Sequence, residues 1–301
     1  MSILVVGNAT VDISYEIKRL PSIGETLLAS GRMVDAGGKG LNQAIAASRW
    51  GVDVHLLAPL GDDAAASVIR DQLDSEKLEN VELLIGPFST DESIIFVTPD
   101  GSNIIVSTDS TAKWLSIDNL KHRLGLILAK DTLLLQGNLS KETTEKCLKE
   151  GKTTGVRTVL NPSPIGFSYD GIWPLVRIAV LNEIEAAQLG SSKDPEIAGR
   201  NLLKLGVETV VITLGSEGAM AIYEGQSIMF GAPKMDVVDT AGAGDAFVGS
   251  LVAALDMGLP FMEGMKFSIE VASLTVTKRG TTSAFPSHKK IRKLIKCKPI
   301  R

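Results

Sequence analysis

The chain has 301 residues, of which 44% are hydrophobic, so it carries enough apolar material to bury a sizeable core. Its 35 acidic residues outnumber its 31 basic residues, and the net charge of -4 excludes the basic surplus that a general nucleic-acid binder needs. The cysteines and histidines are too few and too scattered for a disulfide framework, a structural zinc site or histidine-based catalysis; they are Cys147, Cys297, His55, His122 and His288.

These features also predict the compartment. Few cysteines favour a reducing environment, no apolar run is long enough to cross a bilayer, and the first residues carry no basic leader. We therefore expect a cytoplasmic protein that engages neither nucleic acid nor membrane.

Short β-branched and leucine-rich runs alternate along the chain with longer segments of helical spacing. The runs are apolar on both faces, which is typical of parallel strands buried between helices. We expect strands at 3–6, 54–58, 132–135, 158–160, 178–181 and 209–213, and helices at 42–50, 64–73, 143–152 and 197–205. The alternation predicts an α/β fold with a doubly wound, mainly parallel sheet, whose sites lie at the carboxyl ends of its strands. The basic end, 288–301, is expected to be a solvated terminal helix.

Two stretches, 13–35 and 92–108, interrupt this alternation with hairpin patterns. The second contains a turn signal, Pro99 to Gly101, between two apolar runs. We expect the two stretches to pair into one small sheet, inserted in a single domain of residues 1–301. That sheet would act as a lid, as a dimer contact, or as both.

The segment 239–247 joins an apolar, extended run ending at Val237-Val238 to a helical pattern. Gly242, Ala243 and Gly244 have little or no side chain, so their backbone N–H groups can approach an anion at the positive end of the helix. Asp245 would stand beside that anion, where it could take a proton from a substrate hydroxyl. An ordinary helix start, with Asp in the first turn, is the structural alternative.

A second glycine cluster, 37–42, opens the first long helix. It is not a phosphate-binding loop of the Walker type, because Met33 stands where the first glycine belongs and Gly40 where Ser or Thr should bind the metal. The chain also lacks the Gly-x-Gly-x-x-Gly fingerprint of dinucleotide binding. The cluster could bring backbone close to a small polar ligand, with Lys39 and Asn42 offering polar groups to hydroxyls. A plain turn before a helix remains the alternative.

Seven segments, taken in order, resemble the ribokinase-like, phosphofructokinase B-type carbohydrate kinases, with ribokinase as the nearest pattern. They are 5–12, 21–26, 37–44, 61–63, 182–185, 213–215 and 239–247. The resemblance spans nearly the whole chain. It implies ATP-dependent phosphorylation of a sugar hydroxyl by an α/β domain that carries a small β-sheet lid, which often forms a dimer contact.

The resemblance gives Asp245 the role of general base and makes Gly242, Ala243 and Gly244 the anion hole. It implies a substrate pocket made of Thr10, Asp12, Gly38, Lys39, Asn42, Asn138 and Asp245. Ribokinases proper tend to carry Asn at position 10 and Glu at position 138. The expected activity is phosphorylation of the terminal hydroxyl of a small sugar, a pentose such as ribose.

For the nucleotide, the resemblance implies contacts from Asn182, Thr213, Gly215, Ser216, Gly218, Gly244 and Ser268. Asn182 and Glu185 would organise Mg²⁺, although Glu183 and Glu185 could instead form a solvated helix face. A potassium site would involve Asp239, Ala241, Thr275, Lys278 and Gly280. A serine ligand of that site is replaced by Ala284, so we expect only partial activation by K⁺.

Other functions stay open at this point. Kinases for fructose, deoxyribose or ketodeoxy acids share the framework, but an acid substrate would need an extra cation and Lys39 is the one obvious candidate. A nucleoside kinase would need aromatic residues in the lid, where Tyr15 and Phe96 are the main ones. A non-catalytic sugar or nucleotide sensor would have no need of Asp245.

Overall fold

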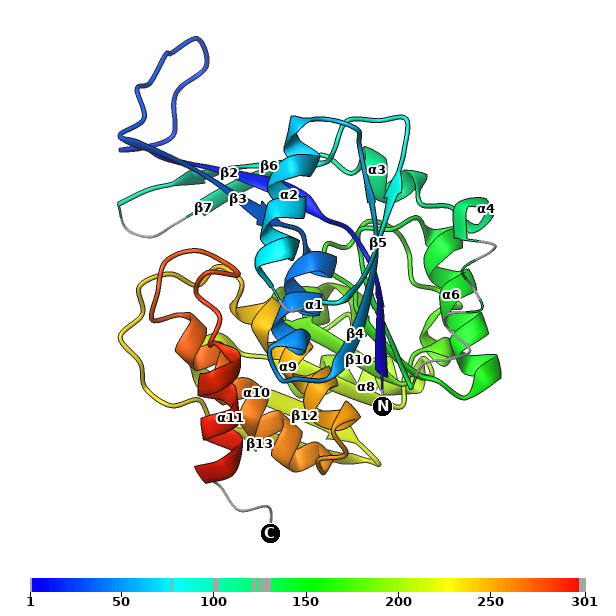
Figure 1. Ribbon diagram of the computed structural model, residues 1–301. Helices are drawn as coiled ribbons and strands as arrows, with labels where there is room; N and C mark the ends of the chain where they lie inside the picture. Colours follow the sequence, from blue (N-terminus) through cyan, green and yellow to red (C-terminus); the bar gives the residue numbers. More distant parts are fainter. Residues whose placement is uncertain are drawn as a thin grey trace.

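The computed structural model describes residues 2–76, 78–99, 103–120, 123, 125 and 131–297. It has an α/β body built on a nine-stranded sheet, in which the described strands run in the order β13-β12-β11-β10-β9-β8-β1-β4-β5 (Figure 1). Seven strands are parallel, and the hairpin of β12 and β13 adds two antiparallel strands at one edge. The strands are β1 (Ser2–Val6), β4 (Asp53–Leu60), β5 (Asn80–Ile85), β8 (Thr132–Gln136), β9 (Arg157–Asn161), β10 (Ile178–Asn182), β11 (Thr209–Thr213), β12 (Ala219–Tyr223) and β13 (Gln226–Phe230). The predicted fold class is confirmed.

The sheet is buried because alternate side chains of each strand enter two different cores. In β1, Ile3 and Val5 belong to one apolar cluster, whereas Leu4 and Val6 belong to the other. Helices α1 (Lys39–Ser48), α2 (Ala64–Ser75), α9 (Ala243–Asp256) and α10 (Phe261–Thr275) enclose the first cluster. Helices α6 (Lys141–Thr154), α7 (Glu183–Leu189) and α8 (Pro195–Lys204) enclose the second (Figure 1).

A separate four-stranded sheet, here called the second sheet, has the order β3-β2-β6-β7. It consists of β2 (Thr10–Glu16), β3 (Gly31–Gly37), β6 (Glu92–Val97) and β7 (Asn103–Ser107). These bounds agree with the predicted stretches, although β2 begins three residues earlier than expected. The sheet projects from the main body (Figure 1). Of the predicted turn Pro99 to Gly101, Asp100 and Gly101 lie outside the described residues.

Helices α1 and α9 begin differently from their neighbours. Asp63, Ser140 and Asp194 cap α2, α6 and α8 with side-chain oxygens that accept first-turn N–H groups. In contrast, α1 begins after Gly38 and α9 after Gly242, neither of which has a side chain to offer. In α1, Asn8 replaces the missing cap, because its Oδ1 accepts the N–H of Gly40 and its carbonyl accepts the N–H of Leu41. At the start of α9, the N–H of Gly244 donates to no acceptor among the described residues, so this donor is available to a ligand.

The run that ends at Val237 and Val238 lies outside the described strands: both residues are exposed, in a stretch without regular structure, and the N–H of Val238 donates to the carbonyl of Val276. One sequence prediction needs correction. The terminal helix exists as α11 (His288–Cys297), but it is not simply solvated, because Ile291 is buried in the core. Residues 298–301 and His122 lie outside the described part of the chain.

The remaining described elements are short: α3 (Ser110–Trp114), α4 (Ile117–Leu120) and the 3-10 turns η1 (Trp173–Leu175) and η2 (Gly215–Glu217). Within the described ranges, no helix combines the length and apolar character that crossing a bilayer requires.

Candidate active site

The carboxylate of Asp245 lies where the first turns of α1 and α9 meet. Its Oδ2 accepts a hydrogen bond from Asn42 Nδ2 at 3.0 Å, and its Oδ1 accepts one from Gln43 Nε2 at 2.9 Å. Lys39 Nζ is 3.8 Å from Oδ1. Asp245 is only 7% exposed. The structure thus joins the two glycine-led segments that the sequence singled out, although they are about 200 residues apart.

The turn before Asp245 is open to an anion. Gly242 has φ +73°, and a Cβ there would lie 2.7 Å from Thr281 Cγ2, so glycine is required for both reasons. A Cβ on Gly244 would meet no atom within 4 Å, so this residue faces free space. The N–H groups of Gly242 and Gly244 donate to no acceptor among the described residues, whereas that of Ala243 makes a long contact of 3.3 Å with Thr240 O.

Asp12, on β2 of the second sheet, approaches the same space. Burial raises the pKa of the Asp12 carboxyl; hydrogen bonds from Thr10 and Ser93 oppose the rise, and the charge of Asp245 adds to it. Thr10 Oγ1 donates to Asp12 Oδ1 at 3.0 Å. Gly37 is the neighbour that makes room, because a Cβ there would lie 2.1 Å from Asp12 Oδ2. Asp12 and Asp245 are therefore close enough for their charges to interact.

Three buried acceptors in this region have no partner. Among the described residues, Asn42 Oδ1, Gln136 Oε1 and Asn138 Oδ1 accept no hydrogen bond. Buried polar atoms of this kind are costly unless a ligand or water satisfies them. Because all three are acceptors, the missing partners must be donors, and water and the hydroxyl groups of a sugar are donors.

The start of α1 packs closely against residues 8–10, which follow β1. Gly38 has φ +94°, and a Cβ there would lie 2.9 Å from both Ala9 Cα and Thr10 N. Asn8 Oδ1 accepts the N–H of Gly40 at 3.2 Å. This close approach puts Gly38 and Lys39 next to Thr10, as the predicted pocket requires.

The predicted nucleotide residues lie mainly at the carboxyl edge of the sheet. Asn182 and Thr213 are register partners at the ends of β10 and β11. Gly215 and Ser216 are exposed in the following 3-10 turn, which ends at Gly218 with φ +103°. Ser268 is different: it is wholly buried in α10, and its hydroxyl donates to Gly264 O at 2.7 Å. Its side chain is satisfied inside the protein and does not face the open loop.

Asn182 and Glu185 form a reciprocal helix cap. Asn182 Oδ1 accepts the N–H of Glu185 at 2.8 Å, and Glu185 Oε2 accepts the N–H of Asn182 at 3.0 Å. Glu185 is buried, so the expectation of a solvated face applies to Glu183 alone. The cap leaves Glu185 Oε1 without a hydrogen bond to any described residue, which fits a contact with a hydrated Mg²⁺.

The two segments predicted to hold K⁺ are also brought together. Asp239 Oδ1 accepts the N–H of Ala241 at 2.9 Å, and Oδ2 accepts that of Gly280 at 3.0 Å. Thr275 is buried in α10, and its carbonyl accepts the N–H of Lys278. Each carboxylate oxygen of Asp239 keeps a further lone pair, so the donor set fits a monovalent cation.

Sequence reasoning missed three amides beside Asp245. Gln43, Gln136 and Asn161 form a buried hydrogen-bonded chain that ends on its carboxylate. Gln136 and Asn161 are the last residues of β8 and β9 and are register partners. The sequence signal that could have revealed Gln136 and Asn161 is a polar residue at the end of an apolar strand.

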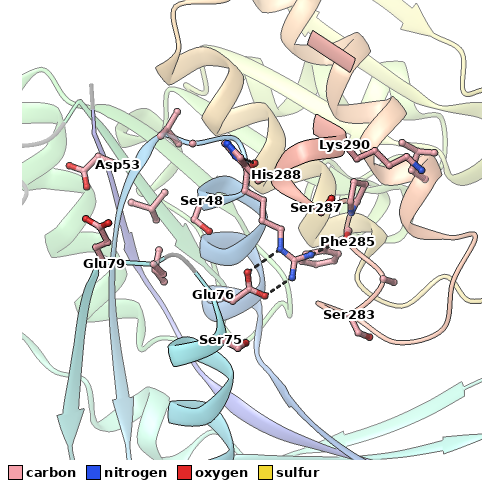
Figure 2. Close-up of a pocket in the computed structure, with 18 of the residues that line it drawn as sticks. Ser48, Asp53, Ser75, Glu76, Glu79, Ser283, Phe285, Ser287, His288 and Lys290 are labelled. Atoms are coloured by element: carbon pink, nitrogen blue, oxygen red, sulfur yellow. Dashed lines mark hydrogen bonds and ion pairs between the residues drawn. The ribbon is translucent and has the colours of Figure 1, made fainter. Parts of the chain in front are cut away.

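A cavity of about 890 Å³ is lined by the segment 283–288, on the side of that segment away from the anion-binding turn (Figure 2). Arg49 crosses it, forming an ion pair with Glu76 and donating to Phe285 O at 2.9 Å. The Phe285 ring separates this cavity from the anion-binding turn, because a Cβ on Gly242 would lie 2.9 Å from Phe285 Cε1. None of the predicted catalytic or sugar-binding residues lines the cavity.

Comparison with known proteins identifies the family of this chain. The model of the pfkB family carbohydrate kinases matches residues 1–288. The chain belongs to this family. It is 28% identical to a ribokinase from Haemophilus influenzae over 292 residues, with 95% of each chain covered. It is 30% identical to a deoxyribokinase from Salmonella typhi over 294 residues, covering 95% of this chain and 96% of the relative.

A solved structure gives the same result for the fold. Arabidopsis thaliana ribokinase, complexed with ribose and ATP, superimposes with a TM-score of 0.86 at 29% identity, and 98% of each chain is covered. The resemblance inferred from the seven segments and the assignment as a carbohydrate kinase are therefore confirmed.

Proposed function

We propose that this protein transfers the γ-phosphoryl group of ATP to the terminal hydroxyl of a small sugar, a pentose such as ribose. The observation that carries the proposal is the position of Asp245: a buried carboxylate in the first turn of a helix that begins with an uncapped, open glycine turn. The arrangement combines a proton acceptor with an anion site, which is what phosphoryl transfer to an alcohol needs.

In the proposed reaction, Asp245 accepts the proton of the sugar's terminal hydroxyl as that oxygen attacks phosphorus. The free N–H groups of Gly242 and Gly244 stabilise the negative charge that develops on the transferred group. Both contributions depend on fixed geometry, which the buried contacts of α1 with α9 supply.

The sugar would be held by hydrogen bonds that complete the unpaired acceptors. Its other hydroxyls donate to Asn42 Oδ1 and Asn138 Oδ1 and to the Asp12 carboxylate. A ligand that lacks one of these hydroxyls leaves a buried acceptor unpaired, so the same atoms provide selectivity. The ribose in the Arabidopsis structure supports a pentose, and the deoxyribokinase relative makes deoxyribose the alternative.

The nucleotide would bind across the ends of β10 and β11, with Thr213, Gly215, Ser216 and Gly218 against its phosphates and ribose. Asn182 and Glu185 would hold Mg²⁺ partly through water, and the ion would neutralise phosphate charge. The Asp239–Gly280 junction would hold K⁺ beside the anion hole. Support for ATP comes from the nucleotide in the Arabidopsis ribokinase structure.

The deciding experiment is an ADP-release screen with Mg²⁺ and ATP over pentoses, deoxypentoses, hexoses, sugar acids and nucleosides. Nucleosides are included because Tyr15 and Phe96 stack in the second sheet, with ring centroids 6.3 Å apart. We expect a pentose to give the highest kcat/KM. A nucleoside or a sugar acid at the top of the ranking would contradict the substrate class.

Asp245→Asn is the matched variant, since the amide keeps the shape and removes the basic oxygen. We expect turnover to fall by about three orders of magnitude or more, while calorimetry still detects binding of ATP and sugar. Comparable turnover in both proteins would remove Asp245 from the mechanism.

A further inference from the structure

We propose that Gln43 is a positioning residue for Asp245, and that its own amide is oriented by Gln136 and Asn161. The proposal rests on the role of Asp245 as the base in the proposed function. Gln43 is not assigned to substrate or nucleotide, and it acts through the carboxylate that it contacts.

The contacts form one connected chain of buried amides. Gln43 Nε2 donates to Asp245 Oδ1 at 2.9 Å and to Asn161 Oδ1 at 3.0 Å. Gln43 Oε1 accepts from Gln136 Nε2 at 2.9 Å. Gln43 and Gln136 are fully buried, so water does not compete for these bonds.

A backbone carbonyl fixes the orientation of these amide groups, because it can only accept a hydrogen bond. Asn161 Nδ2 donates to the backbone carbonyl of Val180 at 2.9 Å. The Oδ1 of Asn161 therefore faces Gln43 and requires a donor. The NH₂ group of Gln43 must then lie on the side of Asn161 and Asp245, while its carbonyl lies toward Gln136. Gln43 consequently presents a proton, and never a lone pair, to the Asp245 carboxylate.

A comparison with Asn42 separates positioning from substrate binding. Asn42 also donates to Asp245, but its Oδ1 is unpaired and is left for a ligand. In Gln43, both amide protons and the carbonyl oxygen are already used within the protein. Gln43 has no donor left for a sugar hydroxyl, so its influence on the reaction must pass through Asp245.

The charges around Asp245 indicate what the hydrogen bond from Gln43 contributes. Asp12 is a second carboxylate close enough to repel the charge on Asp245. Without the Gln43 donor, the one remaining polar contact of Asp245 Oδ1 among the described residues would be Lys39 Nζ, at 3.8 Å. A buried carboxylate that loses a hydrogen-bond donor is harder to ionise. The carboxylate would also be free to rotate away from the position that Asn42 and Gln43 now define together.

The surrounding backbone is shaped to admit the chain. A Cβ on Gly7 would lie 2.0 Å from Gln136 Oε1, so only glycine at the end of β1 leaves room for the Gln136 amide. Gly7, at the first turn after β1, thereby contributes to the position of a base on α9.

The test compares three variants of the full-length protein by pH–rate profiles of sugar-dependent ADP release. Gln43→Met removes the donor at nearly constant volume. Gln136→Met removes the group that orients Gln43 but does not contact Asp245. Thr143→Val is the control, because it breaks a buried hydrogen bond, from Thr143 Oγ1 in α6 to Leu115 O, that involves neither Asp245 nor any of the three amides.

We expect Gln43→Met to lower kcat by about tenfold or more and to move the acidic limb of the profile upward by about one pH unit, while KM for ATP changes less than about twofold. Gln136→Met should change both quantities in the same direction by a smaller amount. Thr143→Val should leave the profile unchanged even if thermal unfolding shows lower stability.

The proposal is overturned if Gln43→Met folds and keeps the wild-type kcat and acidic limb, or if Thr143→Val shifts the limb equally. If Gln43→Met does not fold, Gln136→Met decides by the same criteria. The failure of the proposed function looks different: wild type would then release no ADP with any sugar, or Asp245→Asn would be as active as wild type, and both proposals would be withdrawn.

Discussion

Helix α9 carries a buried carboxylate near each end, and the two have opposite surroundings. Asp245 receives hydrogen bonds on both oxygens. Asp256 is 2% exposed, and neither oxygen has a hydrogen-bond partner among the described residues. It is the last residue of the helix, where the helix dipole also disfavours a negative charge. Burial, with the nearby charges of Asp131 and Asp53, raises the pKa of Asp256 from near 3.8 to about 6.

This difference predicts a pH-dependent gain in stability for Asp256→Asn. The unfolded chain ionises at a lower pH than the folded protein, so the charged carboxylate destabilises the fold increasingly between about pH 4 and pH 6 and fully above that range. We expect the variant to raise the free energy of unfolding by about 1–3 kcal/mol at pH 8, and by less at pH 5. Urea unfolding at both pH values measures this.

Asp74→Asn is the matched control, since Asp74 is an exposed carboxylate within α2. Its effect on the free energy of unfolding should stay within about 0.5 kcal/mol at both pH values. An Asp256→Asn variant that gains nothing at pH 8 would show that the folded protein bears no cost for this charge.

At the scale of elements, the start of α9 combines two glycines with different reasons for being glycine. Gly242 is required by its backbone conformation and by the contact with Thr281. Gly244 has an ordinary φ and empty space around its missing Cβ. The fold therefore tolerates a methyl group on Gly244, whereas the proposed anion site does not.

Two single substitutions separate these requirements. Gly244→Ala should keep or raise stability, because Ala is favoured over Gly in a helix by about 0.5–1 kcal/mol, yet it should lower turnover by about 100-fold by narrowing the anion site. Gly242→Ala should lower both turnover and stability, the latter by about 1–3 kcal/mol. Thermal unfolding and ADP release measure the pair. Full activity in Gly244→Ala would place the transferred phosphoryl group elsewhere.

The elements that could be predicted from sequence are the ones buried on both faces. Strands β1, β4, β8, β9, β10 and β11 produce continuous apolar runs, and each was predicted within a few residues. Strands β5, β12 and β13 were not predicted. β5 and β13 are the two edge strands of the sheet, where partly exposed residues such as Glu82 and Ser227 interrupt the apolar signal. β12 lies between β11 and β13 and has an uninterrupted apolar sequence, so its signal was present and was missed.

The residues of the candidate site also differ in how far the sequence could predict them. Gly242, Asp245, Gly38 and Asn42 carry local signals of a small-residue turn before a helix, so sequence reasoning could find them. Gln43 carries no such signal, and Gln136 and Asn161 show only that a polar residue ends each apolar strand. Their contact with one another and with Asp245 depends on the register of β8 with β9 and on the packing of α1 against α9.

For the whole molecule, the second sheet offers a surface suited to another copy of this chain. Among the described strands, β3 and β7 form the two edges of this sheet, and β7 exposes the consecutive residues Ile104, Ile105 and Val106. Exposed apolar edges of this kind commonly mark an interface. We propose that the protein is a homodimer through this sheet.

Ile105→Lys tests the proposed dimer. Ile105 is 54% exposed, so the change should leave the free energy of unfolding within about 0.5 kcal/mol of wild type while placing a charge in the interface. We expect sedimentation equilibrium to show a dimer for wild type and a monomer for the variant. Ile184→Lys is the control, because Ile184 is 79% exposed on α7 of the main body. A monomeric wild type, or a dimeric Ile105→Lys, would refute this interface.

The location of Asp12 on the second sheet and of Asp245 on the main body has a mechanical consequence. The negative charges of the two carboxylates repel each other, and any displacement of β2 relative to α9 would change the strength of that repulsion. The amides that hold Asp245 all belong to the main body, so a displacement of the second sheet would not by itself break their hydrogen bonds. Sugar hydroxyl groups that donate hydrogen bonds to both carboxylates would offset this repulsion, and would thereby favour closure of the second sheet over a bound sugar.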